Sequence, residues 1–203
     1  MTNPFFEPLP AHGVPRFDQI EMPHYLEAFD RGFSEHDQEI QAIISNPEPP
    51  TFANTIEALE LSGAQLRRVA SVFFNLTSSD TNEEMQALEL KIRPRWSAHF
   101  SAIYSNPDLF SRVRAVYEGD ETLQAEQLQL MNETYKHFQR AGAELQGADR
   151  ERVNEINEQL ATLSTRFGQH VLKDTNSFEL VLDEGDDLAG DRKSTRLNSS
   201  HQI

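Results

Sequence analysis

The sequence predicts an all-α fold, an antiparallel arrangement of about six helices with short connections. Apolar residues recur at steps of three or four through most of the chain, as they do on the buried face of a helix. Helix-capping residues precede several of these stretches, and prolines interrupt the chain between them. One segment near residues 178–182 instead alternates apolar and polar residues, which predicts a single strand.

The first two predicted helices follow a proline-rich arm. Residues 1–22 are expected to form an extended arm held in place by its aromatic side chains, because proline disfavours a helix here. Pro23 is a suitable first-turn residue for a helix that ends in "SNPEPP". Asn54 is the predicted N-cap of the next helix, with Glu57 as its reciprocal capping partner and an apolar face that continues to Phe73.

Four further helices are predicted. Thr81 and Glu84 repeat the capping pattern at the start of a helix with Pro94 in its interior, where a kink is expected. Asn106 and Pro107 start a short helix. The last two helices are indicated by apolar positions at Leu128, Met131, Tyr135 and Phe138 and, after Asp149, at Val153, Ile156, Leu160, Leu163, Phe167 and Val171.

Composition excludes several classes of function. The formal net charge is −15, and residues 1–190 alone carry 15 basic and 32 acidic residues, a net charge of −17. Such a surface repels nucleic-acid phosphates and anionic lipid, so neither nucleic acid nor a membrane is an expected partner. The chain has no cysteine, which excludes disulfides and thiolate metal sites, and it shows no signal-like or membrane-spanning stretch; both observations favour the cytoplasm.

The seven histidines do not form a recognisable metal-binding pattern. The "HExxH" motif is absent, and no two histidines lie four residues apart. His12, His24 and His36 are spaced by twelve residues, but the first lies in the arm, so a shared metal site is not expected. Half-buried, hydrogen-bonded side chains are expected for the three histidines beside core positions of predicted helices, His99, His137 and His170.

Paired carboxylates occur at two places, and neither predicts acid–base chemistry. Glu83 and Glu84 lie at a helix start, where they complement the helix dipole, and Asp186 and Asp187 lie in a polar loop. The sequence therefore assigns no catalytic residue, no metal ligand and no bound cofactor to this chain, and leaves its substrate-binding residues undefined.

Several longer strings carry a resemblance to a known family. "NPFFEPLP", "NPEPPTFANTIEALELSG", "VFFNLTSSDTNEEMQALE", "IYSNPDLFSRV" and "NEQLATLSTRFGQHVLKDTNSFELVLDE" resemble, in this order, the N-terminal part of the thimet oligopeptidase family of zinc metallopeptidases. The similarity runs through essentially all of residues 3–190. The string "FFNLTSSDTN" favours the peptidyl-dipeptidase branch of that family.

The resemblance implies a largely helical enzyme with a deep channel and one zinc ion, bound by the two histidines of "HExxH" and a downstream glutamate. Such enzymes remove C-terminal dipeptides from oligopeptides, and the motif glutamate activates the zinc-bound water. Residues 23–176 are expected to form part of the channel wall, and residues 177–190 to begin a truncated, strand-containing region. The family's catalytic and zinc-binding residues lie beyond this segment, so the chain is expected to be inactive without the C-terminal catalytic part of the same protein.

One alternative from another class stays open. In this alternative, the chain is a free-standing acidic helical module that binds a protein partner. A fragment of a larger enzyme is expected to expose an apolar surface that faced the missing part, whereas a self-sufficient module is expected to expose none.

The last thirteen residues, "DRKSTRLNSSHQI", differ from the rest of the chain because they are basic and rich in serine. The run from Asp191 to His201 resembles the translation of a common sequencing-library adapter, with Gln202 and Ile203 contributed by the sample index that follows. A disordered terminus and a weak basic binding patch are the alternatives. We expect residues 191–203 to be a non-native tail.

The adapter interpretation makes a prediction about the DNA. The adapter begins with an adenine just before this run, so Gly190 is expected to be encoded by GGA. Sequencing the source DNA tests this, and any other glycine codon contradicts the interpretation. In the genome, the reading frame after Gly190 is expected to continue into an "HExxH" region.

Overall fold

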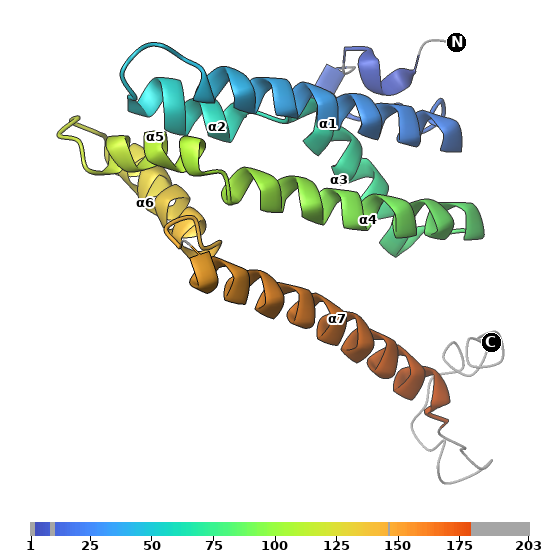
Figure 1. Ribbon diagram of the computed structural model, residues 1–203. Helices are drawn as coiled ribbons and strands as arrows, with labels where there is room; N and C mark the ends of the chain where they lie inside the picture. Colours follow the sequence, from blue (N-terminus) through green and yellow to red (C-terminus); the bar gives the residue numbers. More distant parts are fainter. Residues whose placement is uncertain (1–2, 9–10, 146, 180–203) are drawn as a thin grey trace, which may run out of the picture. The chain divides into compact units, whose positions relative to one another are not determined.

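The computed structural model describes residues 3–8, 11–145 and 147–179, and within these residues the fold is helical without a strand (Figure 1). The all-α prediction is confirmed. The α-helices are α1 (Met22–Ile44), α2 (Ala58–Leu61), α3 (Ala64–Ser79), α4 (Glu83–Tyr104), α5 (Pro107–Tyr117), α6 (Ala125–Arg140) and α7 (Gly147–Ser177). Three short elements accompany them, the 3-10 helices η1 (Pro4–Phe6) and η2 (Ala11–Gly13) and the π-helix η3 (Phe52–Glu57). The chain divides into two compact units, Met1–Gln146 and Gly147–Ile203.

The second predicted helix is interrupted. Its N-cap is Thr51 rather than Asn54: the Thr51 hydroxyl accepts from the Asn54 amide at 3.2 Å, and the Asn54 side chain accepts from the Thr51 amide at 2.9 Å. The segment begins as η3, continues as α2, and ends at Ser62, after which Gly63 turns the chain with φ +70°. The prediction of one continuous helix was therefore wrong. The sequence did not reveal the break because the helical spacing of apolar residues is the same on both sides of it.

The starts of the later helices follow the predicted pattern with small shifts. Asn82 caps α4, rather than Thr81, by accepting from the Met85 amide at 2.9 Å. The predicted Asn106 cap of α5 is confirmed, with Pro107 in the first turn. Of the predicted strand near 178–182, Phe178 and Glu179 have no regular structure, and the rest lies outside the described residues, as does the tail.

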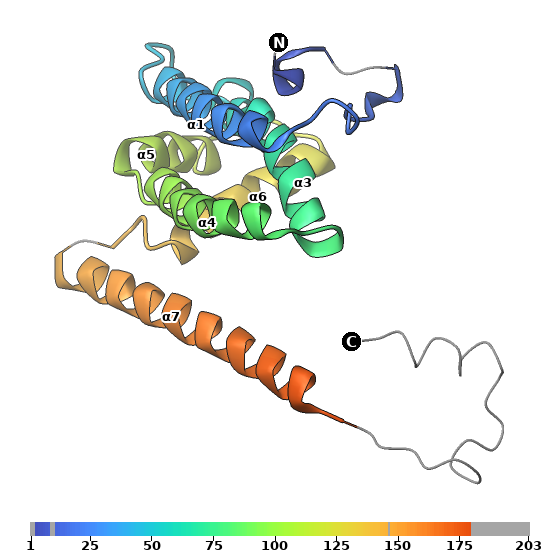
Figure 2. The ribbon, with the colours of Figure 1, turned by 90° about the vertical axis from the view of Figure 1, so that its right-hand side faces the viewer.

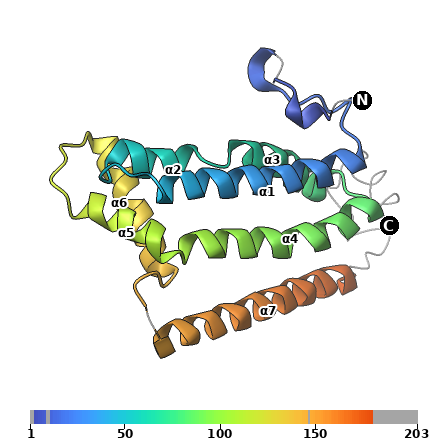
Figure 3. The ribbon, with the colours of Figure 1, turned by 45° about the horizontal axis from the view of Figure 1, so that its top comes forward.

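Helix α1 lies at the centre of the first unit. It is antiparallel to α3, since Tyr25 meets Phe73 and His36 meets Ser62. It is parallel to α4, since Asp30 pairs with Arg95 at 2.6 Å and His36 bonds His99 one to two turns further along. Figures 1 and 3 show α1 and α4 running alongside each other, and Figure 2 shows α3 on one side of this pair and α5 on the other.

Two hydrophobic clusters form the core of this unit. The first joins the N-terminal half of α1 to α3 and α4, with Phe29 and Phe73 fully buried and their rings packed edge to face. The second joins the C-terminal half of α1 to η3, α5 and α6, around Ile56, Leu109 and Phe138. Aromatic and aliphatic side chains of this size bury enough apolar surface to stabilise the packing of every helix in the unit.

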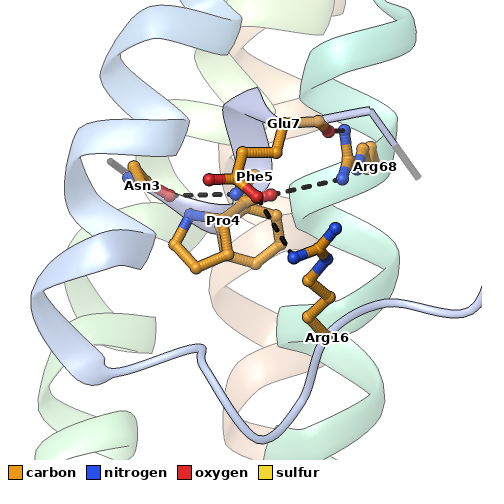
Figure 4. Close-up of polar contacts among 6 residues, drawn as sticks. All are labelled: Asn3, Pro4, Phe5, Glu7, Arg16 and Arg68. Carbon is orange, nitrogen blue, oxygen red and sulfur yellow. Dashed lines mark hydrogen bonds and ion pairs between the residues drawn. The ribbon is translucent and has the colours of Figure 1, made fainter. Parts of the chain in front are cut away.

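The N-terminal arm is fixed to α1 and α3 by its backbone and by one aromatic ring (Figure 4). Asn3 caps η1 by accepting from the Phe5 amide, and the Phe5 ring is buried against Tyr25. Arg68 on α3 donates to the carbonyl oxygens of Glu7 at 2.8 Å and of Pro4 at 3.3 Å. The arm therefore covers the end of the first hydrophobic cluster.

Helix α7 forms the described part of the second unit and, taken by itself, carries an apolar face. Side chains at steps of three or four along this face are exposed: Ile156, Leu160, Leu163, Phe167 and Val171. Within the described part of the chain, no helix is long and apolar enough to cross a membrane.

Replacing Arg68 tests how the arm is held. In Arg68→Met the apolar stem remains but both hydrogen bonds to the arm are lost, and charged donors contribute about 1.5–3 kcal/mol each. We expect the free energy of unfolding, measured with urea, to fall by about 1–3 kcal/mol. The matched control is Arg152→Met, whose exposed ion pair with Glu155 contributes at most about 0.5 kcal/mol; an equal loss in both variants contradicts the role of Arg68.

Candidate functional site

The structure places the histidines in very different surroundings. His12 is exposed and has φ +70°, and His24 accepts a hydrogen bond from the Glu21 amide at 2.9 Å in the first turn of α1. His137 is exposed, and its ring stacks on the Tyr104 ring with the two ring centroids 3.9 Å apart. His170 is also exposed, so the half-buried positions predicted for these last two were wrong.

His36 and His99 form the most closely connected polar cluster of the described residues. The His99 Nε2 and His36 Nδ1 atoms are 2.9 Å apart, and His36 Nε2 lies 3.1 Å from the Ser62 hydroxyl. The outer nitrogen of His99, Nδ1, lies 3.4 Å from Asp37 Oδ1. The chain of groups Ser62–His36–His99–Asp37 therefore joins the α2–α3 break, α1 and α4.

The three inner members of this cluster are almost completely enclosed, whereas the Asp37 side chain is 66% exposed. His36 is 4% exposed and Ser62 5% exposed, and the His99 side chain is 8% exposed. The rings of Phe33 and Phe100 pack against the His99 ring, with centroids 5.0 and 5.3 Å away. Burial is the main cause that lowers the pKa of His36 and of His99, since a charged imidazole loses its hydration here.

Gly63 allows the His36 ring to approach the backbone. A Cβ atom at this position would lie 2.9 Å from two atoms of the ring, closer than side chains pack. The adjacent amide of Gly63 donates to Glu39 Oε2 at 2.6 Å. The break between α2 and α3 is thus fitted to one face of α1.

The Ser–His–His–Asp order suggests a serine nucleophile, but the geometry does not support one. The Ser62 hydroxyl donates to the Leu59 carbonyl oxygen at 2.7 Å rather than to His36. The neighbouring Gly63 amide, which an oxyanion hole would need, already donates to Glu39. The cluster is a buried hydrogen-bond network and not a catalytic triad.

No metal centre is found among the described residues. They contain no group of three or more His, Cys, Asp or Glu side chains placed to hold a metal ion. Residues of this part of the chain therefore do not fit the zinc ion that the family resemblance implies. Glu83 and Glu84 lie in the first turn of α4, where carboxylates complement the helix dipole, and Asp186 and Asp187 lie outside the described residues.

Two shallow grooves mark the surface of the first unit. One, of about 400 Å³, lies between α1 and the η3–α2 segment and includes Glu39, Asn46 and Asn54 in its lining. The other, of about 370 Å³, lies between α4 and α6. It is mostly apolar and is lined by Trp96, Phe100, Ser101, Tyr104, His137 and Ala141.

Known proteins similar to this chain are peptidases. It is 40% identical over 192 residues to the dipeptidyl carboxypeptidase of Salmonella typhimurium, which covers 93% of this chain and 28% of that protein. It is 41% identical over 179 residues to the dipeptidyl carboxypeptidase of Escherichia coli, and this match covers 87% of this chain and 26% of that protein. Oligopeptidase A of Escherichia coli is 24% identical over 193 residues. No protein-family model matches the chain.

The helical fold and these similarities confirm the resemblance to the oligopeptidase group of peptidases. The chain is more similar to the two dipeptidyl carboxypeptidases than to oligopeptidase A. The chain spans about a quarter of the length of the two dipeptidyl carboxypeptidases that it matches.

The sequence did not predict the pairing of His36 with His99. The two residues are 63 positions apart, and no spacing rule connects them. A weaker signal was present, because His36 falls on the same helical face as Phe29, Phe33 and Ile40 and so had to be buried. A buried imidazole requires a polar partner, but only the packing of α4 on α1 determines which one.

Replacing Gly63 tests the close approach to His36. We expect Gly63→Ala to lower the free energy of unfolding, measured with urea, by more than about 2 kcal/mol, since it combines a left-handed alanine with displacement of the ring. Gly13→Ala is the matched control, because Gly13 has φ +69° and no atom within 4 Å of its added Cβ. That control is expected to cost only about 1–2 kcal/mol. Equal losses in the two variants would show that the contact with His36 is unimportant.

Proposed function

We propose that this chain is the N-terminal part of a zinc metallopeptidase that removes C-terminal dipeptides from oligopeptides. The observation that carries the proposal is the identity of 40–41% to two dipeptidyl carboxypeptidases over 87–93% of the chain. The lower similarity to oligopeptidase A extends over 94% of the chain and supports the same class of enzyme.

In this proposal the helices bind and confine substrate rather than carry out the chemistry. The sequence has no "HExxH" motif, and the described residues offer no metal-binding group, so zinc is held by another part of the enzyme. The helical unit forms part of a channel wall that admits unstructured oligopeptides. The whole enzyme works in the cytoplasm, without nucleic acid or membrane as a partner.

Helix α7, taken by itself, carries a row of large apolar side chains along one side. Leu160 is 54% exposed, Leu163 58% and Phe167 70%, all on one side of the helix. A row of large exposed apolar side chains of this kind marks a surface that another part of a protein covers. We therefore expect α7 to pack against another segment, either of this chain or of the longer protein.

A chimaera tests the proposed function. The corresponding segment of the dipeptidyl carboxypeptidase of Escherichia coli is replaced by residues 3–179 of this chain, and zinc-dependent release of C-terminal dipeptides from an oligopeptide is measured. We expect the chimaera to retain activity within about tenfold of the parent, because the helices supply a wall and not the reacting groups. The matched control carries the corresponding segment of oligopeptidase A, which is expected to lower activity further.

Two outcomes contradict the proposal. A folded chimaera without dipeptide release shows that these helices are not interchangeable with those of the relative. Zinc-dependent dipeptide release by the purified 203-residue chain alone shows that the chain contains its own catalytic site.

A further inference from the structure

The His36–His99 pair holds a single proton between its two rings. The Ser62 hydroxyl donates to the Leu59 carbonyl oxygen, so it accepts from His36 Nε2–H. His36 Nδ1 is then the acceptor for His99 Nε2–H across 2.9 Å. In the opposite tautomer the shared proton belongs to His36, and again only one proton lies between the rings.

A first added proton is accommodated by this arrangement. It binds His99 Nδ1, which faces Asp37 Oδ1 at 3.4 Å, so His99 keeps its bond to His36 and gains an ion pair. A second added proton has to bind His36 Nδ1. Two N–H groups then face each other between two positively charged rings whose centroids are 4.9 Å apart, and the shared hydrogen bond is lost.

The charged groups around the pair do not remove this conflict. On α1, Asp37 and Glu39 favour a positive charge, but Glu39 already accepts a hydrogen bond from the amide that follows Ser62. On α3, the Arg67 guanidinium is held near the cluster by its hydrogen bonds to the carbonyl oxygens of Leu61 and Ser62. Its positive charge disfavours a positive charge on His36. On α4, Arg95 lies one turn before His99 and is paired with Asp30.

We propose that the His36–His99 pair is an acid-sensitive joint, which holds α4 against α1 and the Ser62–Gly63 break at neutral pH and releases α4 when both rings are protonated. The joint lies between the two hydrophobic clusters, since Phe33 of the first and Ile40 of the second flank His36 on α1. When α4 moves away, the Phe33 ring of α1 loses its contact with His99, and the Phe100 ring of α4 loses its contact with the His36 ring.

The direction of the pH dependence follows from the pKa values. Burial lowers the pKa of His36 and the charge of His99 lowers it further; burial also lowers the pKa of His99, while Asp37 opposes this. The unfolded chain therefore binds protons first as the pH falls below the ordinary value of about 6.5. The stabilisation is fully present above that pH and is lost as the pH falls toward the folded-state pKa values.

The experiment is a pH titration of the histidine ring signals by NMR in the 203-residue chain. We expect the ring signals of His99 to titrate below the ordinary value of about 6.5 and those of His36 last, with loss of the His36–His99 hydrogen-bonded proton signal as His36 titrates. Titration of His36 at or above the ordinary value of about 6.5, or at the same pH as His99, overturns the proposal.

A variant at His99 distinguishes the effect of the His99 charge on His36 from the effect of burial alone. In His99→Gln the side-chain amide still donates to His36 Nδ1 but carries no titrating charge, so His36 is expected to titrate at a higher pH than in the unaltered chain. The urea midpoint is expected to fall less between about pH 7.5 and about pH 5.5 than in the unaltered chain or in the matched control His170→Gln. An unchanged His36 titration, or an equal fall in all three proteins, overturns the proposal; if His99→Gln does not fold, the ring titration of the unaltered chain decides.

Discussion

The contact between the His36 ring and the Gly63 backbone is the constraint on which the packing of the first unit depends. It brings the break between α2 and α3 onto α1, so that α3 returns antiparallel along α1. The same ring bonds His99 and so sets the position of α4 along α1. Three segments far apart in the sequence are thereby placed by one buried side chain, and the hydrophobic clusters on either side fill the space that this placement leaves.

A polar network between two apolar clusters has consequences beyond stability. Apolar side chains pack in many registers at similar free energy, whereas a chain of buried hydrogen bonds is satisfied in one register only. The Ser62–His36–His99 network therefore makes the alignment of α1, α3 and α4 specific. It also makes that alignment dependent on protonation, because imidazole is the side chain that changes charge near neutral pH.

The function proposed for this chain rests on similarity to peptidases, and the structure is consistent with a supporting part of such an enzyme. The described residues carry helices, an arm fixed by Arg68, an aromatic-lined groove and an apolar face on α7, and they contain no group of side chains placed to hold a metal ion. In the proposed enzyme, a channel wall built from these helices contributes to catalysis by restricting the substrate to a productive position. Such a wall can be acidic or apolar without containing a reacting group.

The sequence alone determined the helical class, most helix boundaries and the family resemblance, because apolar periodicity, N-caps such as Asn106 and long matching strings are local properties. It failed at Ser62–Gly63, where the helical pattern continues through a turn, and at His137 and His170, where burial depends on which faces meet. Only the tertiary structure decided the parallel pairing of α1 with α4 and the bond between His36 and His99. These contacts join residues more than 60 positions apart, and no local preference of the chain encodes which distant partner satisfies a buried polar group.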